Sequence, residues 1–192
     1  RAKGVLMRSQ QMSEEDAFRA LRTHAMQTNL RLGQVAQQLI ESARSAEAVN
    51  RAGQLRMLSQ RIVKLQALLA CGCEEEDARA LLASSMERID NTVAWLKRQL
   101  SQATFGDLLD ALLLPSDELK TLMQAGASKE ALPRSDELAE RLLAAAELLV
   151  GTLEEAGGQS TLAVINVCGR QRMLSQRLAK QALLGALLGA ET

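Results

Sequence analysis

Aromatic residues are nearly absent from this sequence. Phe, Trp and Tyr together make up 2% of its 192 residues and only two residues are proline, whereas hydrophobic residues make up 47%. β-Sheets draw on aromatic and β-branched side chains, but Ala and Leu supply most of the apolar side chains here. The composition therefore predicts an all-α protein whose core is built from aliphatic helix surfaces.

Cysteine and histidine are scarce as well, with three cysteines and one histidine. An odd number of cysteines gives no disulfide framework, which favours a cytoplasmic setting. Cys71, Cys73 and His24 offer too few ligands for zinc, so we expect no metal site. No apolar run approaches the roughly 20 residues that span a bilayer, so we expect no membrane contact. No nucleophile beside a base, phosphate-binding loop or carboxylate pair is recognisable, so we expect no enzyme activity and no cofactor.

Positive charge is concentrated near the N-terminus. The net charge is zero, with 23 basic and 23 acidic residues, but residues 1–44 contain seven basic and four acidic ones. This excess predicts that any contact with nucleic acid belongs to the N-terminal segment.

One stretch of sequence occurs twice. Residues 49–69 read VNRAGQLRMLSQRIVKLQALL and residues 165–185 read INVCGRQRMLSQRLAKQALLG. Ten of the 21 aligned positions are identical, including the unbroken RMLSQR at 56–61 and 172–177. Six consecutive matches in one short chain indicate two copies of one motif rather than two amphipathic helices that are similar by chance.

Helical spacing of apolar residues predicts six helices, over about 1–10, 14–29, 31–71, 75–102, 135–156 and 160–188. Two glycines and two prolines within residues 103–133 favour short helices and turns there, namely Gly106, Pro115, Gly126 and Pro133. From residue 46 onward we therefore expect an antiparallel four-helix bundle, with the motif copies on its first and fourth helices. Those two helices would be neighbours that run in opposite directions.

Each motif copy places glycine, amide and arginine side chains on one helix face. Glycine inside a helix costs about 1 kcal/mol relative to alanine, so Gly53 and Gly169 indicate a close approach of two backbones. Arg56 and Arg172 in one shared seam would repel each other unless an anion lay between them. The alternative is that these arginines simply pair with Glu or Asp of other helices.

Both copies have the order N-x-x-G-x-x-R-M-L-S-Q-R, at 50–61 and 166–177. This order resembles the P-box of bacterial nitrate- and nitrite-sensing proteins and is similar to the PilJ-type domain of chemotaxis transducers. The resemblance covers about residues 46–190 and implies a four-helix sensor domain over residues 45–192. It also implies that four motif residues hold nitrate or nitrite, namely Gly53, Arg56, Gly169 and Arg172. The one departure is Cys168, where the family prefers alanine.

Residues 1–44 carry a second signature. The segments A-K-G-x-L-M at 2–7, S-E-E-D-A-F-x-x-L-R-x-x-A-M at 13–26 and L-x-x-V-A at 32–36 resemble the ANTAR domain. The resemblance implies a small three-helix module that binds RNA hairpins and prevents transcription termination, here with the first half of its first helix missing. Four basic residues are the candidates for contacting RNA, namely Lys3, Arg19, Arg22 and Arg31. For any single one of them, ordinary solvation at the surface is the alternative.

These observations predict a cytoplasmic regulator that senses a small oxyanion, nitrate or nitrite, and controls transcription antitermination by binding RNA. A continuous helix over about 32–70 would connect the RNA-binding segment with the anion site. The alternatives are an anion-sensing bundle that acts through protein–protein contacts without RNA binding, and a purely structural helical scaffold. We expect a homodimer, and a receiver domain before Arg1.

Overall fold

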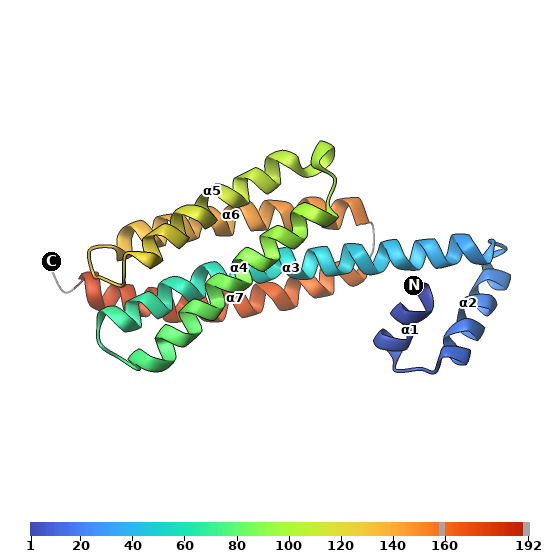
Figure 1. Ribbon diagram of the computed structural model, residues 1–192, viewed down its shortest axis with the longest axis horizontal. Helices are drawn as coiled ribbons and strands as arrows, with labels where there is room; N and C mark the ends of the chain where they lie inside the picture. The colour runs from blue at the N-terminus through green and yellow to red at the C-terminus, as the bar shows by residue number, and fades with distance from the viewer. Residues whose placement is uncertain (158–159, 190–192) are drawn as a thin grey trace. The chain divides into compact units, whose positions relative to one another are not determined.

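Helices make up nearly the whole of the structure (Figure 1). The computed structural model describes residues 1–157 and 160–189, and within them it contains seven helices and no strand. The helices are α1 (Ala2–Gln10), α2 (Glu14–Thr28), α3 (Leu32–Ala70), α4 (Glu75–Gln99), α5 (Gln102–Gln124), α6 (Leu132–Gly157) and α7 (Ser160–Leu188). The prediction of an all-α protein is confirmed. Its physical basis is a chain rich in the two best helix formers, Ala and Leu.

The chain divides into two compact units, Arg1–Glu47 and Ala48–Thr192. The first unit is built from α1, α2 and the beginning of α3, and its core consists of small and aliphatic side chains from all three: Ala2, Leu6, Ala17, Leu21, Ala25 and Val35. The three core residues of α2 are spaced four apart and therefore share one helix face.

Caps fix both ends of α2. The Ser13 hydroxyl accepts a hydrogen bond from the backbone N–H of Asp16 at 3.1 Å and donates one to the Asp16 carboxylate at 2.7 Å. The Ser13 hydroxyl therefore caps the N-terminus of α2, and the Asp16 carboxylate holds this hydroxyl in place. At the other end Asn29 adopts the left-handed conformation, with φ of 54°, and the chain turns there toward α3.

The long helix α3 contains 39 residues and contributes to both units. The predicted continuous helix over about 31–71 is confirmed. It ends at Ala70, and just beyond it Gly72 has a φ of 69°, which allows the backbone N–H of Cys73 to bond to the carbonyl of Leu68 at 2.9 Å. No residue between Ala52 and Ala67 is exposed. This part of α3 is therefore the central helix of the second unit.

The stretch 103–133 was predicted to form short helices and turns, and this prediction is wrong because α5 occupies most of it. This helix continues through Pro115, and its buried residues lie on one face on both sides of the proline, at Leu109, Leu112, Ser116 and Leu119. α5 packs along α6 over much of its length (Figure 1). Burial of this face outweighs the roughly 3 kcal/mol that proline costs inside a helix.

α5 is a fifth long helix in the second unit, and it changes the direction of α7. Successive helices from α3 to α7 alternate in direction, so α3 and α7 run the same way (Figure 1). The expectation that the two motif helices are antiparallel is corrected, because it assumed four alternating helices. The motif copies lie on parallel helices, and any two-fold relation between them has its axis along the helices.

Candidate functional site

The two motif copies meet at their glycines. A Cβ built on Gly169 of α7 would lie 3.9 Å from the Cα of Gly53 on α3. The same Cβ would lie 2.9 Å from Nη2 of Arg56, and a Cβ built on Gly53 would lie 3.3 Å from that atom. The close backbone approach inferred from the repeated glycines is therefore present, and the Arg56 guanidinium occupies the space beside both.

Arg56 brings a buried cation into this seam, with 1% of the residue exposed. Its Nη2 donates to the backbone carbonyl of Asn166 on α7 at 3.2 Å, and its Nη1 donates to Oε1 of Glu147 on α6 at 3.4 Å. Its Nε has no partner among the described residues. Burial lowers the pKa of Arg56 from its ordinary value, whereas the Glu147 carboxylate acts to raise this pKa. The guanidinium is thus desolvated, held by one long carboxylate contact and one backbone carbonyl, and its Nε–H is unpaired.

Amide side chains of both motif copies carry buried oxygens without partners. Asn166 donates from Nδ2 to the Glu154 carboxylate at 2.7 Å, and its Oδ1 has no partner within the described structure. Gln60 and Gln176, at the same motif position, each leave Oε1 unpaired. Buried polar atoms normally have partners, and turning a glutamine amide exchanges its oxygen for a donor. The seam can therefore satisfy water or a small polar ligand.

The second arginine of the predicted site lies outside this seam. Arg172 is exposed, and its Nε donates to the carbonyl of Cys168, one turn back on its own helix, at 3.4 Å. Its helix is an outer one with a solvent-facing side, whereas α3 is surrounded by other helices. The structure therefore brings together Gly53, Arg56 and Gly169, and leaves Arg172 at the surface.

The lysines of the two copies also differ in burial, but here the residue of the second copy is the buried one. Lys180 is completely buried, and its Nζ contacts Asp136 at 2.5 Å and Glu140 at 2.6 Å. Lys64 is partly exposed, and its pKa is lowered first by burial and then by the neighbouring Arg61. Among the residues that the structure describes, the carboxylates that contact the second copy or Arg56 come from α6. Pairing of Arg56 with an acidic residue of another helix was one alternative from the sequence, but the sequence could not identify α6, which lies outside the repeat.

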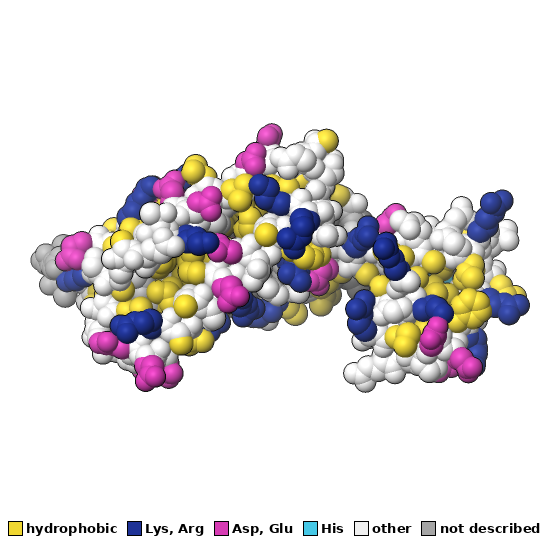
Figure 2. All heavy atoms as spheres, viewed as in Figure 1, with side chains coloured by type: hydrophobic (Ala, Val, Ile, Leu, Met, Phe, Trp, Pro, Cys, Tyr) yellow, Lys and Arg dark blue, Asp and Glu magenta, His cyan; other side chains and the backbone are white. Residues whose placement is uncertain are grey.

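The basic residues predicted to contact RNA lie on the first unit. Lys3 forms an ion pair with Glu14, and Arg19 lies 3.3 Å from Asp16, with all four side chains accessible to solvent. Arg22 and Arg31 are exposed, and neither forms an ion pair with a residue that the structure describes. Figure 2 shows Lys and Arg side chains around hydrophobic side chains on this unit.

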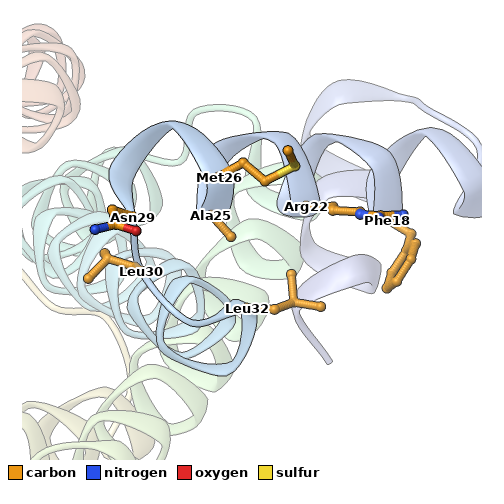
Figure 3. Close-up of a pocket in the computed structure, with 7 residues that line it drawn as sticks. All are labelled: Phe18, Arg22, Ala25, Met26, Asn29, Leu30 and Leu32. Atoms are coloured by element: carbon orange, nitrogen blue, oxygen red, sulfur yellow. The ribbon is translucent and has the colours of Figure 1, made fainter.

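An open hollow of about 470 Å³ borders Arg22 (Figure 3). One face of α2, from Phe18 through Met26 to Asn29, forms most of its wall, and Leu32 of α3 closes one side. Phe18 is 46% exposed and Met26 is 74% exposed. Sequence reasoning missed this surface. The spacing of residues 18, 22, 26 and 29, at intervals of three and four, was the available signal.

Two other kinds of site receive no support from the described residues. Within residues 1–157 and 160–189 no group of three or more His, Cys, Asp or Glu side chains could hold a metal ion, and all three cysteines are exposed and free. No helix in these ranges is long and apolar enough to cross a membrane.

Family comparisons divide the sequence in the same order as the motifs. Residues 1–40 match the ANTAR domain, and residues 37–125 match the type IV pili methyl-accepting chemotaxis transducer N-terminal domain, PilJ. The predicted combination of these two domains is confirmed, although the PilJ match includes only the first motif copy. No curated protein and no solved structure matches the chain. ANTAR indicates an RNA-binding antitermination regulator, and PilJ indicates a signal-sensing helical domain.

Proposed function

We propose that this chain, which joins an ANTAR domain to a PilJ domain, senses nitrate or nitrite and controls transcription antitermination in the cytoplasm by binding RNA hairpins. The observation that carries the proposal is the Arg56 guanidinium, which is buried between the glycines of two identical motifs and has an unpaired Nε.

Arg56 has the chemistry to bind a planar oxyanion. Its planar fork can direct two N–H groups at two oxygens of one anion. Glu147 is the competitor for this fork, but the contact is long at 3.4 Å and 36% of its side chain is exposed. Glu147 can therefore swing into solvent when an anion arrives. In this mechanism the buried arginine exchanges a carboxylate of α6 for the ligand, with Gly53 and Gly169 providing the room.

Calorimetric titration with nitrate, nitrite, sulfate and chloride tests the anion site. Arg56→Ala is expected to weaken nitrate binding by about tenfold or more. Arg172→Ala, the same motif position on the outer helix, is expected to have a smaller effect. Glu147→Gln removes the competing charge and is expected to strengthen binding. Equal nitrate affinity in the parent, Arg56→Ala and Glu147→Gln, with each variant folded by circular dichroism, would overturn the proposal.

RNA binding is tested separately, with hairpin RNA and the whole chain. Contacts to phosphates make affinity fall as salt rises. Reversing charge at Arg19 and Arg22 together is expected to abolish binding, because both side chains are exposed on α2. Unchanged binding would show that Arg19 and Arg22 do not contact the RNA.

A second candidate function, signalling through protein contacts, is favoured by an apolar stripe on α7. Its exposed residues recur at intervals of three, seven and four, and they are Val164, Val167, Leu174 and Leu178, each at least 50% exposed. This spacing suits pairing with a second helix, and we propose that a second copy of the chain covers it. Leu174→Glu is expected to leave a monomer in sedimentation velocity if the parent is a dimer. A monomeric parent would rule this homodimer out.

A further inference from the structure

A second hollow lies at one end of the second unit and contains a buried amide. Its volume is about 330 Å³, and it lies where α3 leads into α4 and where α5 ends (Figure 1). Gln66 of α3 lines it and is 0% exposed, and neither its Nε2 nor its Oε1 has a partner among the described residues. Buried polar atoms normally have partners, and leaving two of them unpaired destabilises the fold. The amide is therefore a donor and an acceptor that a ligand can satisfy.

Gln66 is separate from the glycine seam and from what the two motif copies share. It lies ten residues beyond Arg56 on α3, which is about 15 Å along the helix axis. The equivalent residue of the second copy is Ala182. The shared motif therefore does not require an amide at this position, and Gln66 belongs to the first copy alone.

The walls of the hollow are apolar, and its rim is charged. Leu69, Leu82 and Met123 contribute hydrophobic side chains from three helices. Glu75 and Arg79 of α4 form the rim, with side chains that are 59% and 73% exposed. Arg79 Nη2 lies 3.8 Å from Glu75 Oε2, and an exposed pair this long is weak. Both charges can therefore turn to opposite charges of a ligand. Apolar walls with a few polar groups, in a volume of about 300 Å³ or more, are typical of small-molecule sites.

The polar groups of the hollow define the chemistry of its ligand. An amide is matched best by another amide, because the two planar groups exchange two hydrogen bonds, one in each direction. A carboxylate cannot donate to Oε1 of Gln66, and an ammonium group cannot accept from Nε2. At the rim, a cation and an anion four residues apart on one helix suit a zwitterion, whose carboxylate faces Arg79 and whose ammonium group faces Glu75.

We propose that this hollow binds a free amino acid with a carboxamide side chain, such as glutamine. The ligand amide pairs with Gln66, its methylene groups contact the apolar walls, and its two charges pair with Glu75 and Arg79 at the rim. Met123 has an unbranched, flexible side chain that can move to admit the ligand. The second unit would then respond to an amide as well as to an anion, and this inference does not depend on the anion site.

Calorimetric titration of the whole chain with glutamine tests the site. Gln66→Leu is close in size and removes both polar atoms, so it is expected to lose about tenfold or more in glutamine affinity. The free variant should have a higher Tm, because no buried polar atom remains unpaired there, and lost binding would then not reflect unfolding. Arg79→Ala is expected to weaken binding by a smaller factor, because its charge is exposed. Arg88→Ala is the matched control, since Arg88 is an exposed arginine of the same helix that does not line the hollow.

Two other amino acids test whether the amide itself is recognised. Glutamate has the shape of glutamine with a carboxylate in place of the amide, and it is expected to bind about tenfold more weakly or worse. Leucine leaves Gln66 unpaired and should also bind weakly. The proposal is overturned by any of three results: no heat and no gain in Tm with millimolar glutamine, equal affinity of the parent for glutamine and glutamate, or undiminished glutamine affinity in Gln66→Leu. The anion site at Arg56 would stand after each of them.

Discussion

Gly169 has no Cβ, and the space that a Cβ would need is next to the buried Arg56 guanidinium. A Cβ at this position would lie 2.9 Å from Nη2 of Arg56, closer than side chains pack. Gly169→Ala is therefore expected to lower the free energy of unfolding by about 1–2 kcal/mol, because overpacking exceeds the gain in helix propensity. Urea unfolding measures the change.

Gly185→Ala is the matched control for this prediction. Gly185 lies on the same helix, and a Cβ there meets nothing within 4 Å, so alanine should stabilise by up to about 1 kcal/mol. In an Arg56→Ala background the penalty at Gly169 should disappear, because the clashing group is gone. A penalty that persists in that background would show that Arg56 is not its cause.

Lys180 and Lys64 occupy equivalent motif positions but should differ in their effect on stability. Lys180 is completely buried between Asp136 and Glu140. Lys180→Ala removes the cation, leaves a cavity and brings two carboxylates together without compensation. We expect a loss of about 2–4 kcal/mol, below the full value for a buried pair because both carboxylates retain contact with water. Lys64→Ala should cost less than about 1 kcal/mol in the same urea titration; equal losses would contradict this reading of the two sites.

At the scale of elements, local sequence signals predict that no long helix forms over α5, but packing stabilises one there. Pro115 removes one backbone hydrogen bond inside it. Pro115→Ala should therefore raise the free energy of unfolding by about 1 kcal/mol, after allowance for the greater freedom of the unfolded chain. Differential scanning calorimetry would record a higher Tm.

Pro133 provides the control, since it is the second residue of α6 and lies in the first turn, where no backbone hydrogen bond is lost. Pro133→Ala should give no gain in Tm. If both substitutions raise the Tm equally, the interior position of Pro115 is not the cause.

At the scale of the whole molecule, α3 contributes residues to both units. A ligand at Arg56 that shifts α3 can alter RNA binding only if it has different affinities for the two arrangements, and such couplings are typically about 1–3 kcal/mol. A flexible Gly-Ser segment inserted after Ser45 should leave anion binding and RNA binding intact. Their mutual effect, measured by RNA titrations with and without nitrate, should be lost.

The same number of residues inserted in the loop between α5 and α6 is the control for this insertion, because that loop lies within the second unit. Coupling should survive there. Coupling that persists through the Ser45 insertion would show that α3 only tethers the units.

The sequence by itself determined what depends on neighbours along the chain. Composition determined the all-α class, Ser13 and Asp16 determined the start of α2, and the absence of proline allowed α3 to run unbroken. The repeated motif also predicted that two helices approach closely at Gly53 and Gly169. These properties follow from local hydrogen bonds, caps and side-chain volume, which residues a few positions apart decide.

Only the tertiary structure decided how the environments of the two motif copies differ. Arg56 is buried because its helix lies at the centre of the unit, and Arg172 is exposed because its helix lies at the edge. Because α5 continues through Pro115, α7 runs in the opposite direction to the one predicted. Lys180 is buried and Lys64 is not, because the carboxylates of α6 lie beside Lys180. Contacts between segments far apart in sequence decide burial, direction and charge pairing, so two copies of one motif acquire unequal environments and unequal chemistry.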